Sequence, residues 1–188
     1  MLVPDLGVPG GESAITPGYE AAGVDGFYEA NGATYRNPHE DEVRETLARA
    51  LEQWNLDLSS VLDMACGSGE ATLELVAIGA TDISGIDPYT QAAYLERTGL
   101  IAEPLTFADI GNGALEGRSY SLVVCSYALH LCETSRLAAV CIALVRVAPA
   151  LLILSPHKRP VINGGWGWSD PDEFVHRRVH ARLYRSVV

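Results

Sequence analysis

One short stretch combines an acid, a bare backbone and a helix start, which together suit ligand binding. The run from Val61 to Cys66 is mostly apolar but contains Asp63, and Gly67 and Gly69 follow it before a helix-like segment. This order is typical of a buried strand, a tight turn whose backbone can approach a ligand closely, and a helix N-terminus. In an open parallel α/β sheet, the first such unit is where an adenosine-containing cofactor binds.

The same residues indicate which class of cofactor fits. A dinucleotide fingerprint requires a third small residue where this chain has Thr72, and the carboxylate of Asp63 would repel a pyrophosphate. A strand-end acid suits a ligand with a cationic amino-acid portion, because it accepts hydrogen bonds from an ammonium directly or through water. The spacing Asp-x-x-x-Gly-x-Gly closely resembles motif I of the class I S-adenosylmethionine-dependent methyltransferases. The resemblance implies that the turn passes under the cofactor and that Asp63 faces its methionine end.

Two later acids follow their own strands in the order expected for this family. Asp87 ends a second short strand, at nearly the distance from Gly69 at which an acid reaches ribose hydroxyls. In the resembled family an acid after the third strand often contacts the adenine amino group beside an apolar residue, and Asp109 and Ile110 match those places. The resemblance thus implies S-adenosylmethionine as cofactor and S-adenosylhomocysteine as product. The predicted cofactor-binding residues are Asp63, Ala65, Gly67, Gly69, Asp87, Pro88, Asp109, Ile110 and Ser126.

Methyl transfer requires alignment of the acceptor and, for a hydroxyl or an acid, removal of a proton. His130 and His157, which follow the fourth and fifth expected strands, are the candidate bases because histidine titrates near neutral pH. For each, the alternative is a core histidine that is bonded to the backbone. Lys158 and Arg159 are candidate contacts for a carboxylate or phosphate of the acceptor. The predicted substrate residues are Tyr28, Tyr35, Tyr127, Lys158 and Arg159, and no metal ligands are predicted.

These residues are separated by segments that predict a parallel sheet. Apolar runs that begin near residues 61, 82, 103, 120 and 151 predict five strands, with helices near 70–79, 89–98 and 133–148. An asparagine cap, a proline and a glutamate at 37–40 predict an earlier helix start with a capping box. This alternation predicts an α/β fold with a doubly wound, mostly parallel sheet, like that of the class I methyltransferases.

The chain after Ser155 departs from the pattern of the resembled family. That family usually adds two strands there, the last of them antiparallel. Here residues 169–173 resemble a helix start, and only residues 179–186 have room for a clear strand. We therefore expect a shortened C-terminal sheet edge, with six strands or with an irregular strand from residues 156–168. Because an uncovered edge can pair with another chain, a homodimer or a protein partner is an expectation.

Length, charge and composition bound the remaining expectations. The 188 residues suit one domain, with residues 1–36 as a flexible arm that can close as a lid and residues 37–188 as a methyltransferase-like domain. A net charge of −11 counts against a nucleic-acid substrate, although the segment after Ser155 is basic. No secretory signal, membrane-spanning run or paired cysteine spacing is present, so a cytoplasmic location is expected.

Three functions remain at this point. The leading interpretation is an S-adenosylmethionine-dependent methyltransferase that acts on a small molecule or a protein side chain. The second is a non-catalytic S-adenosylmethionine-binding partner subunit, which the short C-terminus motivates. The third is an NAD(P)-dependent oxidoreductase of the Rossmann type, which the glycine turn alone would also allow.

Overall fold

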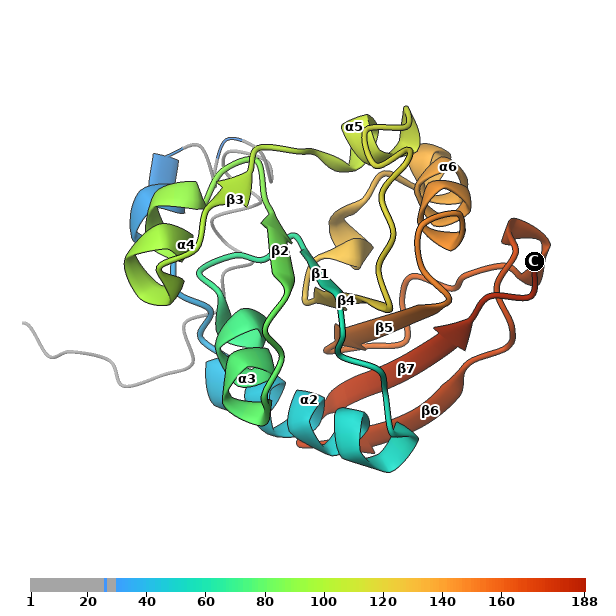
Figure 1. The fold of residues 1–188 in the computed structure, drawn as a ribbon, viewed down its shortest axis with the longest axis horizontal. Helices are drawn as coiled ribbons and strands as arrows, with labels where there is room; N and C mark the ends of the chain where they lie inside the picture. The colour runs from blue at the N-terminus through green and yellow to red at the C-terminus, as the bar shows by residue number, and fades with distance from the viewer. Residues whose placement is uncertain (1–25, 27–29) are drawn as a thin grey trace, which may run out of the picture.

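The computed structural model describes residue 26 and residues 30–188, which form a seven-stranded sheet with helices on both faces (Figure 1). The strand order is β3-β2-β1-β4-β5-β7-β6; the first five strands are parallel, and β7 runs antiparallel to both β5 and β6. The predicted doubly wound, mostly parallel α/β sheet is confirmed. The strands are β1 (Val61–Met64), β2 (Ile83–Ile86), β3 (Ala102–Glu103), β4 (Leu122–Ser126), β5 (Ala150–Ser155), β6 (Asp172–His176) and β7 (Val179–Arg185).

Two layers of helices cover the sheet. Helices α2 (Glu40–Trp54) and α3 (Glu70–Ile78) pack on one face, and α4 (Gln91–Thr98) lies next to α3. Helices α5 (Phe107–Gly111) and α6 (Thr134–Val145) pack on the other face. Three short 3-10 helices are η1 (Gly32–Thr34), η2 (Leu129–Leu131) and η3 (Gly164–Trp166). In the part of the chain that the structure describes, every helix is too short or too polar to cross a membrane.

The side chains of β1 alternate between the two layers, which decides where its acid points. Leu62 and Met64 pack against the layer that holds α5 and α6, whereas Val61 packs against α2 and α3. Successive side chains of a strand point to opposite faces, so Asp63 lies on the same side as Val61. All four residues are buried, as expected for a strand in the centre of a parallel sheet.

The C-terminal edge of the sheet differs from the prediction. The segment that resembles a helix start is strand β6, so the sheet has seven strands and the predicted shortened edge is wrong. β6 and β7 form a hairpin whose two connecting residues, Arg177 and Arg178, have φ of 45° and 67°. Such turns usually carry asparagine or glycine, and an Arg-Arg pair gives no turn signal in the sequence. Pairing of the β6 edge with another chain stays a prediction.

Two local expectations are also corrected. Helix α2 starts at Glu40 with His39 as its N-cap, and Asn37 forms no capping box, because its side chain accepts a hydrogen bond from the His39 backbone N–H at 2.9 Å. Strand β3 is limited to two residues, and the apolar segment after it leads into α5 instead of extending the strand. The residues before α2 and those after β3 therefore lie at the end of the sheet where strands β1, β2 and β4 stop.

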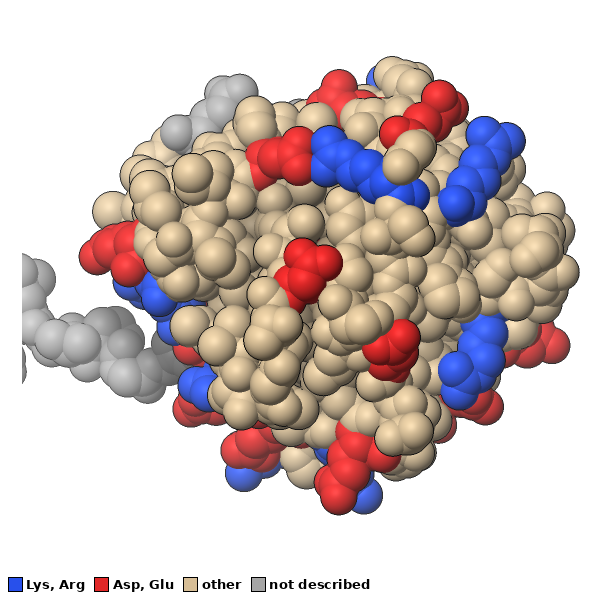
Figure 2. Space-filling view, viewed as in Figure 1, with Lys and Arg blue, Asp and Glu red and all other residues tan. Residues whose placement is uncertain are grey.

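The charged side chains are mixed in sign. On the face that Figure 2 shows, acidic and basic side chains lie mostly around the rim, and several lie next to one another. Among the ion pairs of the molecule, Arg118 pairs with Glu103, and Arg185 pairs with Asp172 at 3.8 Å. Among the described residues on this face there is no continuous basic patch of the kind that binds a polyanion.

Candidate functional site

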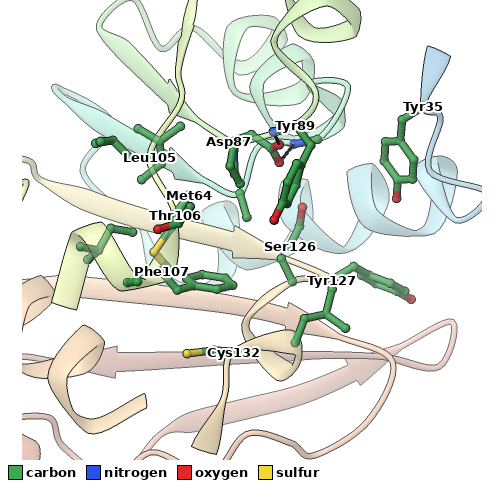
Figure 3. Close-up of a pocket in the computed structure, with 18 of the residues that line it drawn as sticks. Tyr35, Met64, Asp87, Tyr89, Leu105, Thr106, Phe107, Ser126, Tyr127 and Cys132 are labelled. Carbon is green, nitrogen blue, oxygen red and sulfur yellow. Dashed lines mark hydrogen bonds between the residues drawn. The ribbon is translucent and has the colours of Figure 1, made fainter. Parts of the chain in front are cut away.

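A cavity of about 320 Å³ lies at the C-terminal ends of β1, β2 and β4 (Figure 3). The chain leaves β1 towards β2 on one side and β4 on the other, so this is the point at which the strand order reverses and α/β sheets bind ligands. Five segments supply the walls: the turns after the three strands, the β3–α5 connection, and the residues just before α2. Among the predicted residues, Tyr35, Ala65, Gly67, Asp87, Pro88, Ile110, Ser126 and Tyr127 line the cavity.

The two glycines of the turn after β1 have different roles. Both have left-handed backbone, with φ of 55° at Gly67 and 91° at Gly69. A Cβ on Gly67 would enter the cavity wall, 3.4 Å from Glu70 Oε2 and 3.4 Å from Tyr35 Cε1. A Cβ on Gly69 would instead lie 2.4 Å from Thr98 Cγ2 in helix α4. Gly67 therefore opens the cavity, whereas Gly69, which does not line it, allows α4 to pack against the turn.

Asp63 lies behind the turn and not in the cavity wall. It is fully buried, and its Oδ2 accepts a hydrogen bond of 2.6 Å from the Thr72 hydroxyl, which in turn lies 3.0 Å from the Tyr94 hydroxyl. Its Oδ1 has no hydrogen-bond partner among the described residues. Burial raises the pKa of this carboxyl to about 7. The predicted contact between Asp63 and the cofactor would have to cross the turn.

Asp87 joins the turns after β1 and β2 and lines the cavity. Its Oδ2 accepts from the backbone N–H of Gly67 at 3.2 Å, and its Oδ1 accepts from the N–H groups of Tyr89 and Thr90 at 2.8 and 3.0 Å. A carboxylate offers about four acceptor sites, so this one retains capacity for a ligand hydroxyl. The Thr90 hydroxyl also donates to the Gly67 carbonyl at 2.7 Å, which fixes the two turns to each other.

The β3–α5 connection gives the cavity an apolar end. Leu105, Phe107 and Ile110 line it together with Met64, which lies between Leu105 and Phe107 in Figure 3. Asp109 does not line the cavity, because its Oδ2 accepts from the Thr106 N–H and hydroxyl at 2.9 and 2.6 Å in a capping box of α5. These hydrogen bonds lower the pKa of Asp109. The placement supports an adenine contact for Ile110 more directly than for Asp109.

Tyr127 and Tyr35 border the opposite end of the cavity, near the start of α2. The Tyr127 ring stacks on His39 with 5.5 Å between centroids, and its backbone has a φ of 54°. Burial raises the pKa of the Tyr127 phenol to about 12, so it is a neutral donor at physiological pH. Tyr28, the other tyrosine predicted to contact substrate, lies outside the described residues.

The two candidate bases contact each other but do not line the cavity. The rings of His130 and His157 meet edge to face, with 4.9 Å between centroids. Burial, with a smaller contribution from His157, lowers the pKa of His130 to about 4. Its Nδ1 is buried and has no partner among the described residues, so His130 does not match the alternative of a histidine bonded to backbone through that atom.

Lys158 and Arg159 also lie outside the cavity wall, on the loop after β5. Both are exposed, and their backbone carbonyls accept hydrogen bonds of 3.0 and 3.1 Å from the guanidinium of Arg182. Arg182 itself is 3% exposed, although its sequence context resembled a solvated basic segment. A buried arginine in β7 therefore holds the loop that carries His157.

Several residues that line the cavity were not predicted from the sequence. The most informative is Glu70, an acid that is 2% exposed at the first position of α3, directly after Gly69. Its position beside the glycine turn was a usable signal, because acids are favoured at helix N-termini and buried acids need partners. Among residues 30–188, no group of three histidine, cysteine or acidic residues is placed to bind a metal ion. The other missed residues include Asn37, Met64, Tyr89, Phe107, Leu131, Cys132 and Arg136.

The chain is similar to known proteins in sequence and in fold. A family model described as a methyltransferase domain matches residues 61–149. An uncharacterized protein of Schizosaccharomyces pombe is 32% identical in an alignment that covers 88% of this chain and 90% of that protein. The fold is similar to magnesium protoporphyrin IX methyltransferase from Synechocystis PCC 6803 with bound S-adenosylmethionine (TM-score 0.57, 17% identity, 94% of this chain and 98% of that one). It is also similar to the N-methyltransferase NodS from Bradyrhizobium japonicum in complex with S-adenosylhomocysteine (TM-score 0.62, 14% identity, 85% and 96%).

Proposed function

Because a methyltransferase-domain model matches residues 61–149 and the fold is that of methyltransferases with bound S-adenosylmethionine or S-adenosylhomocysteine, we propose that the chain transfers a methyl group from S-adenosylmethionine to a small-molecule acceptor. The observation that carries the proposal is the cavity at the switch point, which continues from the glycine turn to Tyr35 and Tyr127. Its walls are largely aromatic and aliphatic, as is usual for pockets that enclose small molecules.

The residues around the cavity fit the cofactor. The bare face of Gly67 leaves space that a Cβ would fill, and Asp87 keeps acceptor capacity next to it for ribose hydroxyls. The apolar end offers Phe107 and Ile110 as the surfaces that would hold an adenine ring. When bound there, S-adenosylmethionine supplies a methyl group that its sulfonium sulfur already activates.

The residues of this chain must align the acceptor and keep water from the reacting atoms. Tyr127 provides apolar ring surface at the acceptor end, and its neutral phenol can donate a hydrogen bond that orients the acceptor. Neither His130 nor His157 reaches the cavity wall. We therefore favour an acceptor whose nucleophilic atom can attack the methyl group without first losing a proton to a histidine.

Two measurements test the proposal. Calorimetry should show binding of S-adenosylmethionine and S-adenosylhomocysteine and no binding of NAD. Incubation with labelled cofactor and cell extract, followed by size separation, should then place the label in the small-molecule fraction. Label in the protein fraction would shift the acceptor class to proteins, and cofactor binding without any label transfer would favour a non-catalytic subunit.

We favour this function over the two alternatives that the sequence left open. A partner subunit was motivated by an incomplete sheet, and the described residues form all seven strands. The match of residues 61–149 to a methyltransferase-domain model favours a methyltransferase over a nicotinamide-dependent oxidoreductase. As a matched control for the binding assay, Gly164→Ala changes a glycine with open space around it, whereas Gly67→Val fills the cavity.

A further inference from the structure

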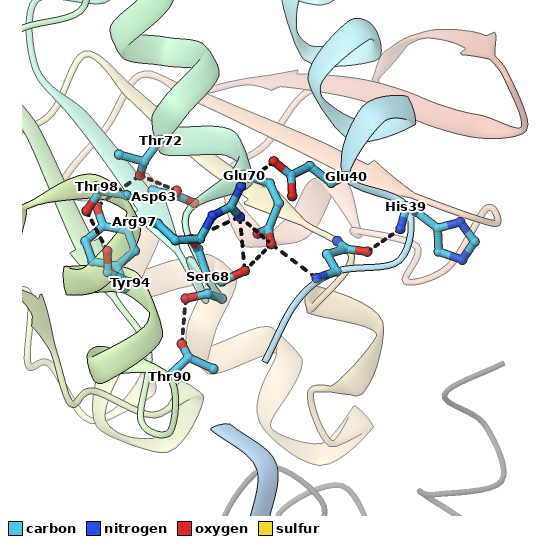
Figure 4. A network of polar contacts seen from close by, with 12 residues as sticks. His39, Glu40, Asp63, Ser68, Glu70, Thr72, Thr90, Tyr94, Arg97 and Thr98 are labelled. Atoms are coloured by element: carbon cyan, nitrogen blue, oxygen red, sulfur yellow. Dashed lines mark hydrogen bonds and ion pairs between the residues drawn. The ribbon is translucent and has the colours of Figure 1, made fainter. Parts of the chain in front are cut away.

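Glu70 is a buried acid at the cavity whose two oxygens are used differently (Figure 4). Its Oε1 accepts from the backbone N–H of Asn37 at 3.3 Å, from Arg97 Nη1 at 3.4 Å, and from the Ser68 hydroxyl. The donors come from the segment before α2, from α4 and from the glycine turn. Three separate parts of the chain thus fix the position of one carboxylate.

The second oxygen of Glu70 borders a space inside the cavity wall. Oε2 lies 3.4 Å from the point where a Cβ of Gly67 would stand, and Tyr35 Cε1 lies 3.4 Å from the same point. A side chain at position 67 would therefore sit between a carboxylate and an aromatic ring. Because Tyr35, Gly67 and Glu70 all line the cavity, this space is part of it.

A space between a carboxylate oxygen and an aromatic ring suits a cation. The carboxylate accepts charge-assisted hydrogen bonds, and the ring attracts the same charge through its negative face. Arg97 forms an ion pair with Oε1 of Glu70 and a second one with Glu40, but it does not line the cavity. Among the described lining residues the one cation is Arg136, which pairs with Glu133 at 3.0 Å. No basic side chain in the described lining is therefore left to fill this space.

We propose that Glu70 and Tyr35 bind the α-ammonium group of S-adenosylmethionine, with Arg97 as the residue that positions Glu70. The proposal rests on the proposed function, since it takes this cofactor as the ligand of the cavity. It transfers to Glu70 the role that the sequence motif suggested for Asp63, whose carboxyl is bonded to Thr72 behind the turn.

A pair of ligands that differ only in the amino-acid portion tests the proposal. S-adenosylhomocysteine carries the ammonium, and 5′-methylthioadenosine has the same nucleoside and thioether without it. In Glu70→Gln, calorimetry should show S-adenosylhomocysteine binding weakened about 10- to 100-fold, the effect of one charge-assisted hydrogen bond. Binding of 5′-methylthioadenosine should stay within about twofold of the wild type, because it makes no use of this carboxylate.

Glu74→Gln is the matched control. Glu74 lies one turn further along α3, and its carboxylate pairs with Arg44 at 3.0 Å. It does not line the cavity, so both ligands should bind as in the wild type. Tyr35→Leu should weaken S-adenosylhomocysteine more than 5′-methylthioadenosine, and Arg97→Met should do the same to a smaller degree. If Glu70→Gln fails to fold, Glu70→Asp keeps the charge, shortens the side chain and should show the same selective loss.

The outcomes separate this inference from the proposed function. Failure of the wild type to bind S-adenosylhomocysteine would overturn the proposed function. Normal binding by the wild type with unchanged affinity in Glu70→Gln would overturn the role of Glu70 alone. An equal loss for both ligands would also overturn it, since it would show that Glu70 only shapes the cavity.

Discussion

At the scale of single residues, side-chain direction decides which acids can meet a ligand. Asp63 and Glu70 lie on either side of the same turn, yet Asp63 points to Thr72 and Tyr94 whereas Glu70 lines the cavity. The type and spacing of Asp63 suggested a ligand contact, but the alternation along β1 turns its side chain towards α3. The motif therefore pointed to the turn that lines the cavity, whereas the side chain of Asp63 itself is not part of the cavity wall.

The buried carboxyl of Asp63 should make stability depend on pH. Its pKa is about 7 in the folded chain and near 3.8 when exposed, so the folded state binds more protons between these values. The contribution of Asp63 to stability should therefore have a negative slope, falling by up to about 4 kcal/mol as pH rises from about 4 to 7, and then level off. In Asp63→Asn, urea unfolding measured from pH 4 to 8 should lose this slope. Asp82→Asn, at an exposed position, should keep it; equal slopes in all three proteins would contradict the assignment.

His130 should produce the opposite trend. Its pKa of about 4 lies below the ordinary 6.5, so the folded state binds fewer protons than the unfolded chain in that window. The stability that the neutral ring supports is thus lost as pH falls from about 6.5 through 4. The NMR signal of the His130 ring should titrate with a midpoint near 4, and His157→Gln should raise that midpoint because a like charge is removed. A midpoint near 6.5 in the wild type would mean that the ring is solvated.

At the scale of elements, the two glycines of the turn after β1 should affect different properties. Gly67 should affect ligand binding, and Gly69 should affect stability. Gly67→Ala places a methyl group in the cavity wall at ordinary contact distances, and Ala65 shows that alanine tolerates a φ of 56° here. Gly69→Ala would press a methyl group into Thr98 and Tyr94 at a φ of 91°. We expect Gly67→Ala to lower S-adenosylhomocysteine affinity with about 1 kcal/mol or less of lost stability, and Gly69→Ala to lose about 2 kcal/mol or more. Calorimetry and urea unfolding distinguish the two, and a reversed pattern would refute these roles.

The β6–β7 hairpin stores backbone strain that one substitution should relieve. Arg178 is exposed and holds a φ of 67°, which glycine adopts without the steric cost that arginine has. Arg178→Gly should therefore raise the free energy of unfolding by about 0.5–1 kcal/mol. Arg185→Gly, at the last residue of β7, should lower it, because glycine is disfavoured in strands and the pair with Asp172 is lost. A loss of stability in Arg178→Gly would show that the arginine side chain contributes more than the strain removes.

The same hairpin shows why part of the sheet was predictable and part was not. Strands β1, β4 and β5 are buried on both faces and therefore read as continuous apolar runs. Strand β6 is an edge strand in which Asp172, Glu173 and Val175 are exposed, and it begins with acids and a preceding proline that are typical of helix starts. Its pairing with β7 depends on a turn without turn-forming residues, so local sequence could not indicate it.

At the scale of the whole molecule, the cavity is assembled from five segments that are distant in the sequence. The sequence predicted the ends of β1, β2 and β4, because each strand carries its own polar residue where it stops. It did not predict that Asn37, Glu70 and Arg97 meet, since their contact depends on how α2, α3 and α4 pack together. The placement of His130 and His157 outside the cavity likewise follows from the loop after β5, which Arg182 holds from β7.

The division into an arm and a domain can be tested at this scale by shortening the chain. All three buried hydrophobic clusters that the structure describes use residues from Val43 onward, so residues 37–188 should unfold cooperatively with a stability within about 1–2 kcal/mol of the full chain. The shortened chain lacks Tyr35, which forms part of the cavity wall, and η1, in which Gly32 packs against the Tyr89 carbonyl. Its affinity for S-adenosylhomocysteine should therefore fall by about tenfold or more.

The design of that experiment follows from the position of Asn37. Its backbone N–H donates to Glu70, so a new chain start there would place an extra ammonium against the carboxylate and mimic the ligand. Residues 37–188 should therefore carry two foreign residues at the N-terminus, and residues 30–188 serve as the comparison because they keep Gly32 and Tyr35. Cooperative unfolding with weakened binding in the shorter chain alone is the expected result. Equal affinity in both chains would show that residues 30–36 contribute nothing to the site, and loss of cooperative unfolding would place the domain boundary before residue 37.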